Sequence, residues 1–244
     1  MSARFEELGW GPTPIGEVSL RRRLDPVTRV DVFEVKLNDE WLMSSQFTVA
    51  EEALAHRGLA RLSDHERGDR PVDVVVGGLG LGYTAASALE HSAVRDMAVV
   101  ELLEPVIEWH EQGLVPLGPV LTADARCRFV QGDFFAMSHE GGYDPADAAR
   151  TFDAVLLDID HSPQHVLDDG SAGFYGVEGM RAVASRISPG GVYAMWSNDP
   201  PDAEYVAILE QVFVDVEAEV ITFHNPLQGR DATATIYLAT KPSE

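Results

Sequence analysis

Two patterns of hydrophobic and polar residues divide the chain near residue 47. Before that point, short segments alternate apolar and polar residues, and turn-forming pairs such as Asp25-Pro26 interrupt them, which is typical of antiparallel strands. The expected segments lie at 18–26, 27–38 and 40–45. One face of the second segment is expected to face a core through Val30, Val32, Val35 and Leu37. The sequence therefore predicts a small N-terminal antiparallel β region over residues 1–47.

A different pattern begins after this region. Thr48 followed by Glu51 has capping-box spacing and predicts a linking helix over about 48–62. From residue 72, strand-like runs alternate with helical segments. Strands are expected at 72–76, 97–102, 128–133, 152–160, 192–197, 216–223 and 233–240, and helices at 83–91, from 104, at 173–187 and at 202–213. This alternation predicts an α/β domain over 48–244, with a doubly wound, mostly parallel sheet of seven strands whose last two are antiparallel.

Composition narrows the choice of partners. The chain carries 18 Lys and Arg against 40 Asp and Glu, a formal net charge of −22, which disfavours binding to a nucleic-acid backbone. No apolar run approaches the length of a membrane span, and the N-terminus lacks the apolar stretch of a signal peptide. The single cysteine, Cys127, fits a reducing compartment. We therefore expect a cytoplasmic protein without a nucleic-acid or membrane partner.

A glycine-rich turn joins the first strand of the α/β region to its helix. Glycines occupy positions Gly77, Gly78, Gly80 and Gly82. At a strand-to-helix junction they permit a tight turn and let a ligand approach the backbone and the helix N-terminus. The alternative is a turn that serves packing alone.

Two acidic residues follow the next strands. Glu101 ends the second strand of this region, where a carboxylate can accept both hydroxyls of a ribose; the alternative is a solvated charge that begins the next helix. Asp133 follows the third strand, where it can accept from an adenine amino group or act as a plain turn residue. Ligands bind at the carboxyl ends of strands in open α/β sheets, so both positions suit a nucleotide.

The sequence LLDIDHSP after the fourth strand concentrates titratable groups. Asp158, Asp160 and His161 are candidates for acid/base chemistry, because burial and neighbouring charges tune the pKa values of such groups. Loop solvation and capping are the alternatives, chiefly for Asp160. A metal site would need further ligands from elsewhere in the chain, and we expect none.

Together these motifs resemble the spermidine synthase (polyamine aminopropyltransferase) family, built on the class I S-adenosylmethionine-dependent methyltransferase fold. The resemblance rests on GGLGLG, VVELLEPVIE, QGDFF, FDAVLLDIDHSP, GFY and SPGGVYAMWS. It implies a donor of the S-adenosylmethionine type, with Gly77–Gly82 around its methionine or aminopropyl end, Glu101 at the ribose, Asp133 at the adenine and Asp158 beside the reacting centre. It also implies that the N-terminal region contributes to the acceptor pocket or to a homodimer contact.

Departures from the family pattern matter for the reaction. The family usually has GGGDGG, whose aspartate contacts the donor's aminopropyl ammonium, but this chain has Gly80 there. Gly80 avoids repulsion with the carboxylate of intact S-adenosylmethionine and removes an ammonium partner. In the later motif, Asp158 is kept and His161 replaces the second acidic residue. These changes favour methyl transfer to a small-molecule amine or hydroxyl, with Asp158 orienting or deprotonating the acceptor and His161 as an accessory base.

Three alternatives remain open. The chain is an aminopropyltransferase that uses decarboxylated S-adenosylmethionine, with another acidic residue in place of the missing aspartate; or it transfers the aminocarboxypropyl arm; or it binds a nucleotide without catalysis. Residues 139–150, rich in glycine and charge, are expected to form either a mobile lid or a surface loop.

Overall fold

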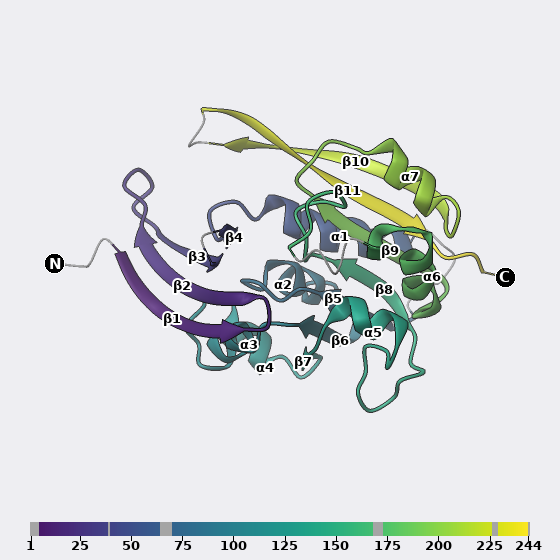
Figure 1. Cartoon of the computed structure of the whole chain (residues 1–244), viewed down its shortest axis with the longest axis horizontal. Helices are drawn as coiled ribbons and strands as arrows, with labels where there is room; N and C mark the ends of the chain where they lie inside the picture. The colour runs from purple at the N-terminus through teal and green to yellow at the C-terminus, as the bar shows by residue number, and fades with distance from the viewer. Residues whose placement is uncertain (1–4, 39, 64–69, 168–172, 226–228, 244) are drawn as a thin grey trace.

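Four strands near the N-terminus form an antiparallel sheet in the order β1-β2-β3-β4 (Figure 1). The computed structural model describes residues 5–38, 40–63, 70–167, 173–225 and 229–243. The strands are β1 (Phe5–Thr13), β2 (Gly16–Leu24), β3 (Asp31–Leu37) and β4 (Glu40–Ser44). One face of this sheet is buried through Val18, Leu20 and Val35, and it joins the core of the larger domain.

Strand β1 is absent from the sequence-based prediction because its segment, FEELGWGPT, has no regular alternation. Its glycines serve close packing instead: a Cβ at Gly9 would collide with the Trp109 ring, and one at Gly11 would lie 2.6 Å from Pro105 Cγ. The expectation for Val30 is wrong, since that residue precedes β3 and is 60% exposed. The alternation of buried and exposed side chains applies within β3, and Val30 lies outside that strand.

The second sheet has seven strands in the order β10-β11-β9-β8-β5-β6-β7. Strands β5, β6, β7, β8 and β9 are parallel to one another. Strand β11 pairs antiparallel with β9 and with β10. The strands are β5 (Val72–Gly77), β6 (Val94–Glu101), β7 (Cys127–Gln131), β8 (Phe152–Leu157), β9 (Ile187–Ser197), β10 (Val214–Asn225) and β11 (Arg230–Thr240). The predicted α/β class, with its mostly parallel seven-stranded sheet and small N-terminal antiparallel sheet, is confirmed.

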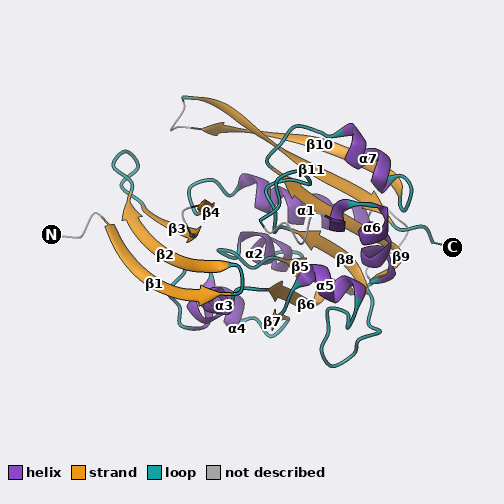
Figure 2. Cartoon of the chain, in the orientation of Figure 1, coloured by secondary structure: helices purple, strands orange, loops and turns teal. Residues whose placement is uncertain are grey.

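Helices cover both faces of this sheet (Figure 2). The helices are α1 (Val49–Ser63), α2 (Tyr83–Leu89), α3 (Glu104–Glu111), α4 (Gly118–Ala123), α5 (Phe134–His139), α6 (Val177–Ser185) and α7 (Ala203–Leu209). The first four contribute to one apolar core together with the N-terminal sheet, and the last three contribute to the other. Both α4 and α5 are too short to give a helical period and were not predicted. None of the helices in the described ranges is long and apolar enough to cross a membrane.

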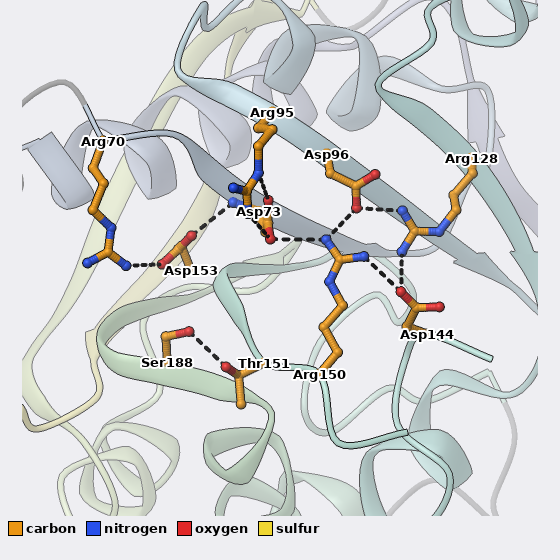
Figure 3. A network of polar contacts seen from close by, with 10 residues as sticks. All are labelled: Arg70, Asp73, Arg95, Asp96, Arg128, Asp144, Arg150, Thr151, Asp153 and Ser188. Carbon is orange, nitrogen blue, oxygen red and sulfur yellow. Dashed lines mark hydrogen bonds and ion pairs between the residues drawn. The ribbon is translucent and has the colours of Figure 1, made fainter. Parts of the chain in front are cut away.

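The segment 139–150 lies at the amino-terminal edge of the parallel strands, where a charge network holds it (Figure 3). Arg150 contacts Asp73 near the start of β5 at 3.0 Å, Asp96 in β6 at 2.6 Å and Asp144 in its own loop at 2.7 Å. Ligands in open α/β sheets bind at the opposite, carboxyl edge. The structure therefore favours the surface-loop alternative over a lid.

Candidate functional site

The glycine turn connects β5 to α2 at the carboxyl edge of the sheet. Gly78, Gly80 and Gly82 have φ values of 95°, 51° and 92°, in the left-handed region that side chains rarely adopt. At Gly78 the space is also closed, because a Cβ there would collide with the backbone oxygen of Asp158. Gly77 is the last residue of β5 and packs against Phe134. The turn is thus tightly packed against the end of β8 while its other side lines a cavity.

A cavity of about 210 Å³ opens beside this turn, and it contains six of the predicted site residues. They are Gly78, Gly80, Glu101, Asp133, Asp158 and Asp160. Its apolar walls include Leu42 from β4 and Phe135 from α5, and the β1–β2 turn adds Ile15. Carboxylates on an otherwise apolar wall suit a ligand that joins a flat base to hydroxyl groups.

Glu101 lies buried at the end of β6, with 8% of its surface exposed. Its Oε2 accepts the N–H of Leu79 at 2.9 Å, and its Oε1 accepts the N–H of Leu103 at 2.8 Å. Burial raises its pKa above the ordinary value, and these backbone donors oppose that effect. The burial excludes the solvated-charge alternative. Each carboxylate oxygen has a second lone pair, so the ribose contact remains a prediction that this geometry accommodates.

Asp133 is an exposed residue that caps α5. Its Oδ1 accepts the N–H groups of Phe135 at 2.9 Å and Ala136 at 3.1 Å. These bonds match the turn-residue alternative, although Asp133 also lies on the cavity wall. Its contact with adenine remains a prediction.

Asp158 pairs with an acidic residue that the sequence analysis did not single out as part of the site. Asp158 and Glu51 are both half-buried, and both line a smaller cavity of about 70 Å³ next to the first. Thr84 Oγ1 donates to Asp158 Oδ2 at 2.6 Å. Burial raises the pKa of Asp158 to about 6; burial and the Asp158 charge raise the pKa of Glu51 to about 8.

The helix α1 explains why Glu51 reaches this cavity. The capping box expected from Thr48 and Glu51 does not form: Thr48 Oγ1 donates instead to the Glu52 side chain, at 2.7 Å. Thr48 thus bonds the second of two adjacent glutamates, and the first lines the smaller cavity beside the glycine turn. Sequence spacing could not show whether Glu51 or Glu52 reaches the cavity, because that depends on how α1 packs beside the end of β8.

Asp160 and His161 lie differently from Asp158. Asp160 is 1% exposed, and it accepts the N–H of Leu167 at 2.7 Å and the O–H of Tyr175 at 2.6 Å. These bonds hold the loop after β8 and match the structural alternative for Asp160, and its acid/base role remains a prediction. His161 is half-buried and lines the smaller cavity, where its ring centre lies 6.4 Å from that of Trp196.

Two further residues of the site carried no signal in the sequence. Met43 in β4 lines both cavities, and its Sδ would lie 2.7 Å from a Cβ at Gly80. The Met43 side chain thus fills the space that a larger residue at position 80 would take. Trp196 in β9 also lines the smaller cavity. Both residues come from strands whose patterns predict only burial.

Comparison with known proteins adds relatives to this geometry. No protein-family model matches the chain. Over 157 residues the chain is 29% identical to Polyamine aminopropyltransferase 2 of Pseudomonas aeruginosa, a match that covers 62% of this chain and 42% of that protein. The chain thus matches less than half the length of that relative.

Solved structures resemble the chain over nearly all of its length. The crystal structure of spermidine synthase from Thermotoga maritima has a TM-score of 0.69 at 17% identity, covering 98% of this chain and 73% of that one. A spermidine synthase in complex with the transition state analogue AdoDATO has a TM-score of 0.70 at 16% identity, covering 98% of this chain and 74% of that one. At these identities the likeness shows the fold.

Proposed function

We propose that this chain, a distant relative of the spermidine synthase (polyamine aminopropyltransferase) family in sequence and in fold, transfers an aminopropyl group from decarboxylated S-adenosylmethionine to a small-molecule amine. The adenosine part of the donor would occupy the larger cavity, between the glycine turn and the walls that carry Glu101 and Asp133. The reacting end would extend past Gly80 and Asp158, which line both cavities.

The observation that carries this proposal is the acidic pair formed by Glu51 and Asp158. Two half-buried carboxylates that share a cavity repel each other, and burial adds the cost of lost hydration. The raised pKa leaves Glu51 largely protonated in neutral solution, and a bound ammonium would favour the ionised form of both carboxylates. An amine substrate, which is cationic in neutral solution, therefore fits the smaller cavity better than a neutral alcohol does.

The same pair changes the argument for methyl transfer. That expectation rested on Gly80, since the usual aspartate partner of an aminopropyl ammonium is missing there. Glu51 supplies an acidic side chain on the same cavity from a different element, α1. The cavity beside Gly80 therefore retains acidic side chains for a cationic substrate, and the named relatives favour the aminopropyl alternative.

The reaction then needs few catalytic groups. The lone pair of the acceptor nitrogen forms a bond to the donor carbon attached to the sulfonium, the carbon–sulfur bond breaks, and its electron pair stays on sulfur as a thioether. Before attack, the acceptor ammonium must lose a proton, and the ionised form of Asp158, which lines the smaller cavity, would receive it. Glu51 would bind the acceptor amine while it is still cationic, and His161 would serve as an accessory base. Orientation of the two substrates within the cavities would supply the rest of the rate acceleration.

Incubation with an S-adenosyl donor and a panel of alkylamines, followed by mass spectrometry, tests the proposal. Decarboxylated donor should yield an aminopropylated amine, whereas intact donor should yield none. Glu51→Gln should lower kcat/KM for the amine at least tenfold, while Glu52→Gln, at a neighbouring residue that bonds Thr48 and lines neither cavity, should stay near wild type. A methylated product formed from the intact donor would refute the proposal.

A further inference from the structure

A buried histidine lies behind the glycine turn and has no place in the chemistry above. His110, in the last turn of α3, has 0% of its surface exposed. Its Nε2 lies 2.9 Å from the backbone oxygen of Gly80. Within the described residues, its other ring nitrogen, Nδ1, is buried and has no hydrogen-bond partner.

The chemistry of the two ring nitrogens determines the direction of this bond. A carbonyl oxygen can only accept, so Nε2 carries the proton and donates to Gly80. Burial lowers the pKa of His110 to about 4, so the ring is neutral at physiological pH and Nδ1 carries a bare lone pair. A buried polar atom without a partner costs free energy that an apolar residue would avoid. Packing alone does not account for a histidine here.

The contact with His110 constrains the glycine turn at Gly80. Gly80 has a φ of 51°, and the peptide that follows it is planar and trans. When His110 holds the Gly80 oxygen, the N–H of Leu81 in the same peptide must point away from His110. The ring also supports the next glycine, because a Cβ at Gly82 would lie 3.0 Å from His110 Cε1.

Glu101 also holds the turn, as a hydrogen-bond acceptor where His110 is a donor. The Glu101 carboxylate accepts the N–H of Leu79, whereas His110 donates to the oxygen of Gly80. Glu101 ends β6 and His110 lies in α3, which begins three positions later at Glu104. One strand–helix unit thus fixes both the amide of residue 79 and the carbonyl of residue 80.

We propose that His110 is a positioning residue for the donor: it holds the Gly80 peptide in the orientation that the donor's reacting end requires. The inference rests on the proposed function in that the glycine turn contacts the donor. A turn fixed before binding loses less conformational entropy when the ligand arrives, so the contact should act on donor affinity. It should act on kcat much less, because His110 lies outside both cavities.

Two substitutions separate the bond from the packing. His110→Leu fills the space without a donor, and His110→Gln places an amide N–H near the position of Nε2. Glu111→Gln changes the adjacent, exposed residue of α3 and is the matched control. Calorimetric titration with intact and with decarboxylated S-adenosylmethionine should show donor affinity reduced at least tenfold in His110→Leu, within about threefold of wild type in His110→Gln, and unchanged in Glu111→Gln.

Amide hydrogen exchange of the ligand-free proteins supplies an independent measurement. Faster exchange at residues 78–82 in His110→Leu than in wild type and His110→Gln would support the inference. Wild-type donor affinity and wild-type exchange in a folded His110→Leu would overturn it. If neither donor bound the wild-type protein, the proposed function would fail, and the exchange rates would still decide whether His110 holds the turn.

Discussion

Replacing Glu51 by glutamine should stabilise the folded protein in neutral and alkaline solution, although it removes a charge from the proposed amine site. Burial and the Asp158 charge raise the pKa of Glu51 from 4.5 to about 8. Since the folded-state pKa lies above the unfolded one, the stability that Glu51 contributes is fully present below about pH 4.5 and is lost as the pH rises through about 8. Glutamine resembles the protonated acid at every pH and avoids that loss.

The size of the effect follows from the same pKa. A change from 4.5 to about 8 corresponds to an upper limit of roughly 5 kcal/mol, at about 1.4 kcal/mol for each factor of ten in proton affinity. Glu51 is only half-buried, so solvent screening reduces this figure, and we expect about 1–3 kcal/mol at pH 8. For a chain of this length, that gain corresponds to a rise in Tm of about 2–10 °C.

Thermal unfolding followed by circular dichroism between pH 5 and pH 9 measures the difference. The Tm of Glu51→Gln should exceed that of wild type by an amount that grows with pH. Glu52→Gln is the control, because Glu52 lines neither cavity and its charge contributes less to the raised pKa of Glu51 than burial and Asp158 do. A Tm difference that stays constant with pH, or a Glu51→Gln protein less stable than wild type at pH 9, would refute the reasoning.

Three further outcomes follow from other contacts. Gly78→Ala should abolish donor binding in calorimetry, because a Cβ there collides with the backbone oxygen of Asp158 in a left-handed conformation. Arg150→Met should lower the free energy of unfolding by about 3 kcal/mol in urea titrations, since it leaves Asp73 and neighbouring carboxylates without that partner. Cys127 should resist alkylation by iodoacetamide at pH 8 until the protein unfolds, because burial raises its pKa to about 12.

Sequence patterns predicted the larger sheet well because its buried strands are continuous apolar runs that can be recognised in the sequence. The run VDVVV is buried on both faces of the sheet as β5, and such continuous apolar runs are typical of parallel strands. The N-terminal sheet was predicted less completely. Strand β1 approaches α3 closely at Gly9 and Gly11. Glycines at these positions interrupt the alternation of apolar and polar residues by which a strand is recognised.

Some residues of the candidate site could be predicted from the sequence and others could not. Glu101 and Asp158 were predictable as cavity residues because each lies at the carboxyl end of a strand, Glu101 as the last residue of β6 and Asp158 directly after β8. Glu51 and Met43 lie outside that rule: they come from α1 and β4, and only the packing of these elements on the glycine turn brings them to the cavity. His110 is hidden for a similar reason, since its partner is a backbone oxygen 30 residues earlier.

The two cavities meet at a set of short contacts around Asp158. The N–H of Asp158 donates to the oxygen of Gly77 at 2.8 Å, and its own oxygen closes the space above Gly78. Its side chain is held by Thr84, in the first turn of the helix that follows the glycine turn. In-line displacement requires reacting atoms at a near-attack distance, and an error of an ångström lowers the rate steeply. In this chain the group proposed to accept the proton and the turn proposed to hold the donor therefore share one packed junction between β5, β8 and α2.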